Sequence, residues 1–433
     1  MISASIGFAI LLALCFAGFP LGFATLAVGL VGFAVLRDWN WHGALTMMSQ
    51  QIMETGASYG LSVIPLFILM GVLIHRSRIS EDLYRAAYAV TGHLPGGVAQ
   101  ATVLACAGFS AVSGSSLATA ATMAKVAMPH MRRYRYDDRL SSGVVSAGGT
   151  LGIMIPPSVP LIIYGLVAQE DVGKLFIAGI LPGVLLVALF LAAVYLTVKL
   201  RPDLGPAGDP MPGPERRQAL LRVWPILALF VLVLGGIYFG VFTPTEAAGI
   251  GATGAAAFAI FRGRLRSWTD WYQSLKETCM TTAALFSVVF GALVFANFIN
   301  LSGLPYDLVD LVQDAQLSGM GVVLAVCAIC IVLGMVFEAV GLLLLIVPVF
   351  LPSLIDLKVD LVWFGIVMVV VVELGLITPP IGMNVFTVKT VVPDLELGKI
   401  FAGVTPFVIA DLVALGLILV FPVIAVGLVA LVR

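Results

Sequence analysis

The chain has 433 residues, of which 60% are hydrophobic and 11% are charged, and its mean hydropathy is +1.09. Soluble domains carry about 25% charged residues, so this composition excludes an ordinary soluble protein and predicts an all-α integral membrane protein in a lipid bilayer. The net charge of −1 gives no sign of a nucleic-acid partner. Several apolar runs reach the roughly 20 residues that a helix needs to cross the hydrocarbon core, for example Leu175–Val198 and Val223–Val241.

Residues 1–75 are predicted to form N-terminal membrane helices that belong to a scaffold. The apolar run Ile6–Leu36 lacks the basic start and the cleavage site of a signal peptide, so we interpret it as membrane sequence. It forms either one long helix or a short pair broken near Gly18-Phe-Pro20.

Residues 76–165 contain the first of two similar patterns. An amphipathic surface helix is expected at Glu81–Tyr88, followed by two apolar arms, Gly97–Val112 and Ala118–Met131, around the polar tip Ser113–Ser116. Each arm is too short to span the membrane comfortably. Basic residues lie at both outer ends, so the pair is predicted to be a re-entrant hairpin.

The same region then carries an unusual break, Gly152-Ile-Met-Ile-Pro156-Pro157. The two prolines remove two backbone donors, and the residue before a proline is biased away from helix. Broken backbone at membrane depth is tolerated only where it is buried in protein or lines a polar cavity. The pattern therefore predicts a broken helix with unwound carbonyl groups.

Residues 301–390 repeat this order. An amphipathic helix is expected at Tyr306–Val312, and two apolar arms, Gly321–Val336 and Leu342–Leu351, flank Phe337–Gly341. A second break follows at Gly375-Leu-Ile-Thr-Pro379-Pro380, with the same internal spacing as the first. Interrupted segments at matching places in two halves are the best sequence indication of a transporter's binding site.

Charge indicates that the two repeats are inverted. Of the 23 Lys and Arg residues, 19 fall in five alternate stretches, which the positive-inside rule places in the cytoplasm. These stretches are residues 76–85, 125–139, 199–222, 262–276 and 389–399. The first repeat starts in a basic stretch, whereas the second starts in an acidic one with Asp307, Asp310 and Asp314. The halves therefore enter the membrane from opposite sides; residues 166–300 are expected to be connecting scaffold helices, and 391–433 a C-terminal membrane segment.

Acidic residues within apolar sequence are functional candidates by default. Glu338 and Glu373 lie beside the second break, so we expect them to help couple transport to a proton or cation. Asp411 has no visible partner in the sequence, and Glu246 is interpreted as a helix cap. Cys327 and Cys330 have no second pair or nearby His, so we interpret them as packing residues. No metal cluster, organic cofactor or ATP-binding loop is predicted.

At these motifs the sequence resembles the large membrane (M) subunit of tripartite ATP-independent periplasmic (TRAP) transporters. The likeness rests on Ser113–Ala121, Gly148–Ser158, Pro244–Ala248 and Gly375–Asn384, and it runs along nearly the whole chain. The resemblance implies an inverted-repeat, elevator-type transporter with two re-entrant hairpins and two broken helices. It also implies sodium-driven uptake of an organic acid, a small four-helix Q subunit, a periplasmic substrate-binding protein, and a place in the bacterial inner membrane.

The resemblance also implies a set of site residues. Carbonyl groups near Ser113, Gly152, Ile155 and Pro157 would bind one sodium ion. Carbonyl groups at Gly341, Gly375, Thr378 and Pro380 would bind a second, with Glu338 nearby. The substrate, such as a C4-dicarboxylate or a sugar acid, would lie near Ser115, Ser116 and Asn384.

Two other functions are compatible with parts of this pattern. A stand-alone ion-coupled carboxylate carrier would share the inverted repeat and need no binding protein. An intramembrane enzyme would need a nucleophile–base pair or a metal cluster at depth, and the sequence contains neither. The resemblance favours the tripartite transporter.

Overall fold

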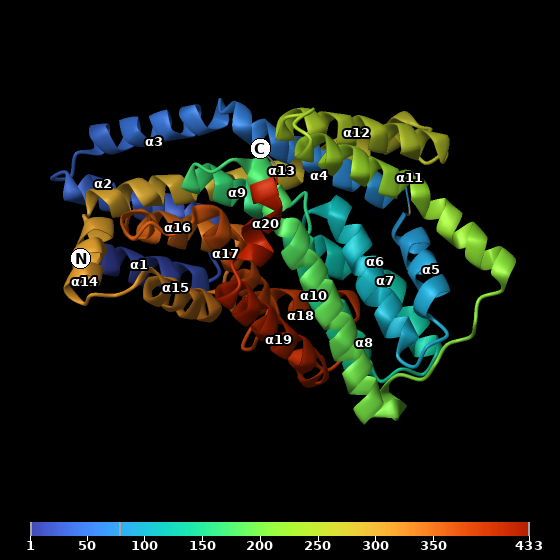
Figure 1. The fold of residues 1–433 in the computed structure, drawn as a ribbon. Coiled ribbons are helices and arrows are strands. Elements are labelled where there is room, and N and C mark those ends of the chain that lie inside the picture. Colours follow the sequence, from blue (N-terminus) through green and yellow to red (C-terminus); the bar gives the residue numbers. More distant parts are fainter. Residues whose placement is uncertain (1, 78, 432–433) are drawn as a thin grey trace.

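The computed structural model describes residues 2–77 and 79–431, and within these residues it consists of twenty α-helices, two short 3₁₀-helices and no strands (Figure 1). Met1, Arg78 of the first basic stretch, Val432 and Arg433 lie outside the described residues. The all-α prediction is confirmed for the part of the chain that is described.

The N-terminal apolar run forms a pair of helices rather than one long helix. Helix α1 (Ile2–Phe16) ends before Gly18, whose φ of +88° suits a glycine, and α2 (Leu21–Leu36) begins directly after Pro20. Helix α3 (Trp41–Gly56), a 3₁₀ turn (Tyr59–Ser62) and α4 (Val63–Arg76) follow.

Helix α2 packs closely along α13 (Trp268–Leu301) because glycines lie at their interface. A Cβ atom added to Gly22 would lie 2.6 Å from the Ser287 carbonyl oxygen, and one added to Gly29 would lie 2.6 Å from the Phe295 nitrogen. Small residues allow membrane helices to approach in this way. Helix α13 also packs against α4, and α4 against α12 (Pro244–Phe261), which in turn contacts α11 (Gly213–Tyr238).

Two halves of the chain contain the same order of helices, and each half holds one predicted repeat, residues 76–165 or 301–390, together with the long helix that follows it. The first half comprises α5 (Ile79–Thr91), α6 (Gly97–Ser113), α7 (Ser116–Arg133), α8 (Asp138–Met154), α9 (Val159–Ala168) and α10 (Val172–Leu200). The second comprises α14 (Leu304–Asp314), α15 (Gly319–Gly334), α16 (Ala339–Asp356), α17 (Leu361–Ile377), α18 (Met383–Val391) and α19 (Leu397–Val420). An offset of 223 residues relates the starts of α7 and α16, the starts of α8 and α17, and the two Pro pairs.

The two halves interlock. Helix α18 of the second half packs on α7 of the first, and α9 of the first half packs on α16 of the second. Helices α8 and α19 also pack together, as do α10 and α19. Helices α6–α10 and α15–α19 therefore form one packed group, called the core bundle below. Figure 1 shows α2, α3, α4, α11, α12 and α13 along one edge of the molecule, beside this bundle; these six helices are called the frame.

Both predicted amphipathic helices are present as α5 and α14. The predicted cap at Glu246 is confirmed: the Thr243 and Glu246 side chains form a reciprocal capping box at the start of α12. In the described part of the predicted C-terminal membrane segment, α19 ends at Val420, and after Phe421 and Pro422 the short helix α20 (Val423–Leu431) begins.

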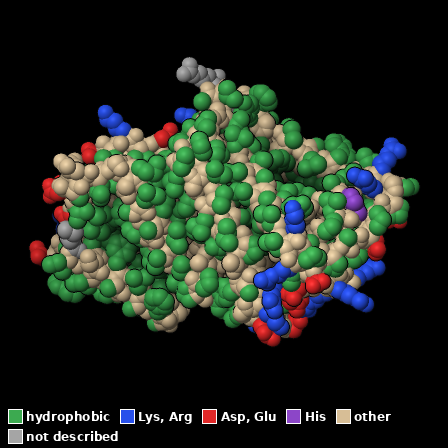
Figure 2. Space-filling view, turned by 60° about the horizontal axis from the view of Figure 1, so that its bottom comes forward, with side chains coloured by type: hydrophobic (Ala, Val, Ile, Leu, Met, Phe, Trp, Pro, Cys, Tyr) green, Lys and Arg blue, Asp and Glu red, His purple; other side chains and the backbone are tan. Residues whose placement is uncertain are grey.

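The helices have the length and composition of a multi-pass membrane protein. Six helical segments in the described chain are long and apolar enough to cross a membrane, and the bent pair α8–α9 makes a seventh. Figure 2 shows apolar side chains over most of one face, with most of the Lys, Arg, Asp and Glu side chains toward its rim. A wide apolar belt bounded by charge is typical of a surface that contacts lipid.

Candidate functional site

The first Pro pair ends a helix in the interior of the protein. Helix α8 stops at Met154, Ile155 has an extended ψ of 118°, and α9 starts at Val159 with a bend of 41°. Pro156 and Pro157 are buried, and the peptide bond between them is cis. Because neither has an N–H group, the Gly152 and Ile153 carbonyls lose their helical donors. The Ser158 hydroxyl donates to the Ile153 carbonyl instead, and its oxygen accepts from the Leu161 N–H at 3.3 Å.

The second Pro pair breaks α17 in the same way, but in a more open place. Helix α17 ends at Ile377, Thr378 has a ψ of 139°, and α18 starts at Met383. Pro379 and Pro380 are exposed, and their shared peptide bond is also cis. The Thr378 hydroxyl donates to the Leu374 carbonyl at 2.5 Å. Both predicted breaks are therefore confirmed, with different surroundings.

The polar tip between α6 and α7 lies directly against the first break. A Cβ atom added to Gly152 would lie 2.5 Å from the Ser115 carbonyl oxygen, and one added to Gly114 would lie 2.8 Å from the Pro157 carbonyl oxygen. The tip is ordered by its own hydroxyls: the Ser113 and Thr119 oxygens are 2.7 Å apart, and Thr119 donates to the Ser115 carbonyl at 2.8 Å. Gly152 and Pro157 of the first predicted sodium site therefore contact the backbone of the tip, directly beside Ser113.

The remaining member of that set, Ile155, forms the C-cap of α8. Its side chain lies against Gly183 of α10, where a Cβ atom would come within 3.1 Å of Ile155 Cγ1. Any part that Ile155 plays in binding an ion would therefore come from its backbone at the break.

The tip between α15 and α16 contacts the second break through backbone atoms. A Cβ atom added to Gly375 would lie 2.7 Å from the Gly334 carbonyl carbon. The Gly382 N–H donates to the Met335 carbonyl at 3.3 Å. Gly341, also predicted for this site, has its α-carbon toward Leu21 of α2, where an added Cβ atom would lie 2.1 Å from Leu21 Cδ2. The structure therefore brings Gly375 and Thr378 together near the end of α15, and Gly341 to the frame.

A cavity of about 670 Å³ lies between the frame and both tips. Helices α2, α4 and α13 form its frame side, and the α6–α7 tip and residues Glu338–Val340 form its core-bundle side. Four of the predicted site residues line it: Ser113, Ser115, Ser116 and Glu338. Its volume falls in the range of about 300–1,000 Å³ that is usual for small-molecule sites.

Asn384, predicted to contact substrate, lies elsewhere. Its side chain is buried, and its amide nitrogen donates to the Ser146 carbonyl of α8 at 3.1 Å. Asn384 therefore joins the second half to α8 and is not among the residues that line the cavity.

Charged and polar residues at one end of the cavity were not predicted as site residues. His75 of α4, Lys125 of α7 and Glu277 of α13 all line it. Glu277 forms an ion pair with Arg76 at 2.9 Å, and His75 Nδ1 lies 3.4 Å from the Thr122 hydroxyl oxygen. These residues come from three helices far apart in the chain, so no local sequence pattern indicates that they meet.

A family model described as "Tripartite ATP-independent periplasmic transporter, DctM component" matches residues 8–424. The chain belongs to this family of TRAP large membrane subunits. It is 35% identical over 382 residues to the C4-dicarboxylate TRAP transporter large permease protein DctM of Pseudomonas aeruginosa, covering 87% of this chain and 88% of that protein. It is 31% identical over 418 residues to the sialic acid TRAP transporter large permease protein SiaM of Vibrio cholerae, covering 95% of each.

Among solved structures, the YdaH transporter of Alcanivorax borkumensis has a similar fold, with a TM-score of 0.58 over 88% of both chains at 16% identity. The relatives are named as transporter permeases, so this TRAP subunit is a multi-pass membrane transporter component and not an enzyme.

Tertiary packing also gives Asp411 a partner that the sequence did not reveal. Asp411 of α19 and Glu373 of α17 are both fully buried, and the two carboxyl groups interact electrostatically. Within the described residues, none of their four carboxyl oxygens has a hydrogen-bond partner. The pair lies inside the core bundle of this TRAP subunit, and Glu373 belongs to the helix that ends at the second break.

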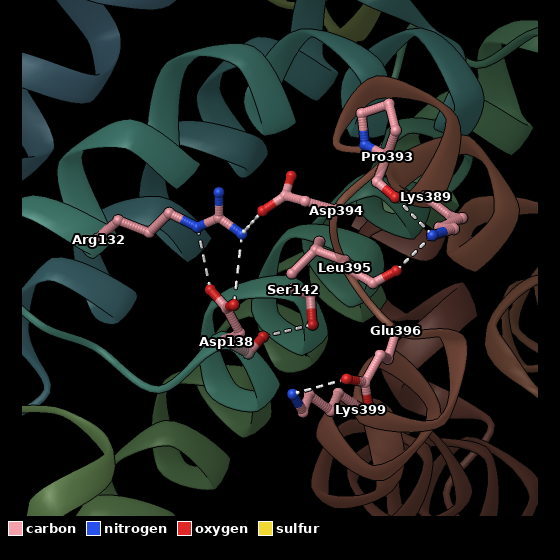
Figure 3. Close-up of polar contacts among 9 residues, drawn as sticks. All are labelled: Arg132, Asp138, Ser142, Lys389, Pro393, Asp394, Leu395, Glu396 and Lys399. Carbon is pink, nitrogen blue, oxygen red and sulfur yellow. Dashed lines mark hydrogen bonds and ion pairs between the residues drawn. The ribbon is translucent and has the colours of Figure 1, made fainter.

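A further cluster joins the two halves of the TRAP subunit at the surface predicted to be cytoplasmic (Figure 3). Arg132, at the end of α7, pairs with Asp138 at 3.1 Å and with Asp394, in the loop before α19, at 2.6 Å. The hydrogen bond from Arg132 lowers the pKa of Asp394. Lys389 closes the same loop by donating to the carbonyls of Pro393 and Leu395.

Proposed function

We propose that this TRAP subunit carries an organic acid across the bacterial inner membrane, coupled to sodium and by an elevator-type movement. The observation that carries the proposal is the cavity of about 670 Å³, which lies between the frame and the tips of both halves. A substrate there would touch Ser115 and Ser116 of the core bundle on one side and the frame on the other. Relative movement of the two groups would then change the side from which the substrate is reached.

Sodium coupling is supported by the chemistry of the two breaks. Sodium is a hard cation, and oxygen ligands suit hard cations. The Pro pairs leave carbonyls without helical donors, and at each break a tip supplies further backbone beside them. We propose sites at Ser113, Gly152, Ile155 and Pro157, and at Gly375, Thr378 and Pro380 with Gly341 and Glu338. Asn384 would affect substrate binding indirectly, through its contact with α8. Glu373 would help to couple sodium binding to substrate transport.

The movement itself follows from how the helices pack. The tips and breaks of the two halves interlock in the core bundle, so they would move together. The α6–α7 and α15–α16 pairs would be re-entrant hairpins that carry the site with them. Sodium would favour the state that holds substrate because its affinity differs between the states.

The substrate class and partners are proposed from the relatives. Relatives are named as transporters of C4-dicarboxylate, sialic acid and ectoine. One is named an isethionate TRAP transporter permease protein DctMQ, of which this chain covers 60%. We propose a small Q subunit that braces the frame and a periplasmic protein that delivers an acid such as a C4-dicarboxylate or a sugar acid.

The test is uptake into proteoliposomes that contain this chain and its small subunit. Labelled succinate and sialic acid are offered under an inward sodium gradient, with and without the binding protein. We expect uptake that needs both sodium and the binding protein. Sodium-driven uptake without the binding protein would instead support a stand-alone carrier. Absence of uptake by folded protein would refute the proposed function.

A further inference from the structure

Lys125 is a charged residue of the cavity that the proposed sodium and substrate sites do not use. It lies on α7, nine residues after Ser116 at the start of the helix, and its side chain is exposed and lines the cavity. Among the described residues, it is the only Lys or Arg in the cavity lining, and it takes part in no ion pair. An unpaired cation facing a cavity is available to an anionic ligand.

Among the charged side chains around the cavity, Lys125 is the cation that is available to an anionic ligand. Two carboxylates line the cavity, Glu277 and Glu338. Glu277 is matched by its ion pair with Arg76 on the frame. Glu338 and Lys125 are then the remaining charged side chains of the lining, so removing the Lys125 charge would leave the lining with a net negative charge. An anion entering such a cavity would be repelled.

The position of Lys125 on α7 indicates where it lies between the tip and the surface that is predicted to be cytoplasmic. Nine residues correspond to about 14 Å along α7 from the tip. The Cα–Cβ bonds of a helix tilt toward its N-terminus, so the Lys125 side chain leaves α7 on the side of the tip, and it lines the same cavity as Ser115 and Ser116. The basic end of α7, with Arg132 and Arg133, lies beyond it on the side predicted to be cytoplasmic. Lys125 thus lies between the tip and that surface.

We propose that Lys125 pairs with the carboxylate of the transported acid on the cytoplasmic side of the cavity and so selects for anionic substrates. This inference rests on the proposed function and adds a specificity-determining residue to it. The ammonium binds as a compact point charge on a flexible stem, which suits a ligand that moves past it. No covalent step is involved; Lys125 only stabilises the charge of the passing acid.

The experiment compares Lys125→Met with Lys125→Arg and with the control Lys399→Met. Met keeps the apolar stem and removes the charge, whereas Arg keeps the charge. Lys399 is another lysine of the same predicted surface; it pairs with Glu396 at 3.2 Å and lies outside the cavity lining. Each variant is reconstituted with its small subunit and checked for monodispersity and for an unchanged thermal unfolding temperature.

Binding of the acid that the wild type transports is measured without the binding protein, so that only the membrane subunits select. Because hydrogen bonds to charged groups are stronger than those between neutral groups, we expect Lys125→Met to weaken binding of labelled succinate or sialic acid roughly tenfold. Lys125→Arg should restore most of the affinity, and Lys399→Met should leave it unchanged. Competition by the neutral diamide succinamide should be equal in wild type and Lys125→Met.

The two proposals fail in different ways. If the wild type transports and binds acid but Lys125→Met binds it equally well, the assignment of Lys125 is wrong and the proposed function stands. An equal loss of acid and succinamide binding would also overturn it, because the effect would then be one of shape and not of charge. If the wild type transports no acid at all, the proposed function fails, and the inference fails with it.

Discussion

The first and second breaks share a backbone plan and differ in what surrounds them. Pro156 and Pro157 are buried, and the nearby carbonyls are met by Ser158 and by a tip that contains three serines. Pro379 and Pro380 are exposed, and the corresponding tip has Glu338 where the first has Ser115. The inverted repeat thus gives the two breaks a similar backbone. The side chains make the surroundings of the first break closed and rich in hydroxyl groups, and those of the second break open and acidic.

Because of this difference, we expect the two tips to bind different ligands in the proposed transport cycle. The first tip provides hydroxyls and carbonyls to the cavity, all neutral ligands. The second tip adds the carboxylate of Glu338 to the same cavity. We therefore expect a cation to be attracted more strongly by the second tip, and a polar substrate to find more hydrogen-bonding groups at the first.

The largest effect should come from removing the prolines of the buried break. In Pro156→Ala/Pro157→Ala, two new N–H groups can bond the Gly152 and Ile153 carbonyls and extend α8 through the break. Displacing these groups from the tip by about 1 Å is enough to reduce the uptake rate roughly a hundredfold. Sodium-driven uptake in proteoliposomes, normalised to membrane-inserted protein, measures this loss.

The matched variant is Pro379→Ala/Pro380→Ala at the exposed break. Because fewer atoms pack around those prolines, we expect a smaller loss of uptake and a smaller fall in thermal stability. Equal uptake by the wild type and by the variant at Pro156 and Pro157 would show that the buried break is not part of the site.

A second large effect is expected at the glycine of each break. An alanine methyl at Gly152 would meet the Ser115 carbonyl at 2.5 Å, and one at Gly375 would meet the Gly334 backbone at 2.7 Å. Such overpacking costs about 1–3 kcal/mol, so both Gly→Ala variants should unfold at lower temperature and transport more slowly. Gly416→Ala on α19 is the control, because its methyl would meet no atom within 4 Å. If both Gly152→Ala and Gly375→Ala unfold at the same temperature as the wild type, the tips do not pack closely against the breaks.

The parts that the sequence predicts well are those that a few adjacent residues determine. The Pro pairs stop their helices because of their own chemistry, and Thr243 and Glu246 cap a helix within one turn. The pairing of Glu373 with Asp411 and the burial of Asn384 depend on how distant helices pack, and no local pattern records that. The charged residues of the cavity, His75, Lys125 and Glu277, were not predicted for the same reason. They come from three helices that are far apart in the sequence.

We expect a moderate effect when the residue at the matching position of each tip is replaced, Glu338 in the second tip and Ser115 in the first. Glu338 is the N-cap of α16 but makes no capping hydrogen bond, whereas the Ser115 hydroxyl accepts from the Ala118 N–H at 3.4 Å. Glu338→Gln should therefore leave thermal stability unchanged and raise the sodium concentration for half-maximal uptake about tenfold, as expected for losing one charged contact. Ser115→Ala should do the reverse, lowering stability slightly with little change in sodium dependence. A sodium titration at fixed substrate decides; equal sodium curves for wild type and Glu338→Gln would remove Glu338 from the sodium site.

The smallest effect concerns the surface contact that joins the two halves, Arg132 with Asp394. Arg132 lowers the pKa of Asp394, so the contact stabilises the folded protein above the ordinary aspartate pKa of about 3.9 and is lost as the pH falls through the lowered value. Asp394→Asn should slightly lower the unfolding temperature at neutral pH, and the gap to the wild type should close in acid below about pH 4. The exposed Asp203→Asn is the control, with no gap expected at either pH. Because both partners are in contact with solvent, salt should shrink the gap at neutral pH as well. A gap that persists in acid would show that Asp394 stabilises the loop through its shape and not through its charge.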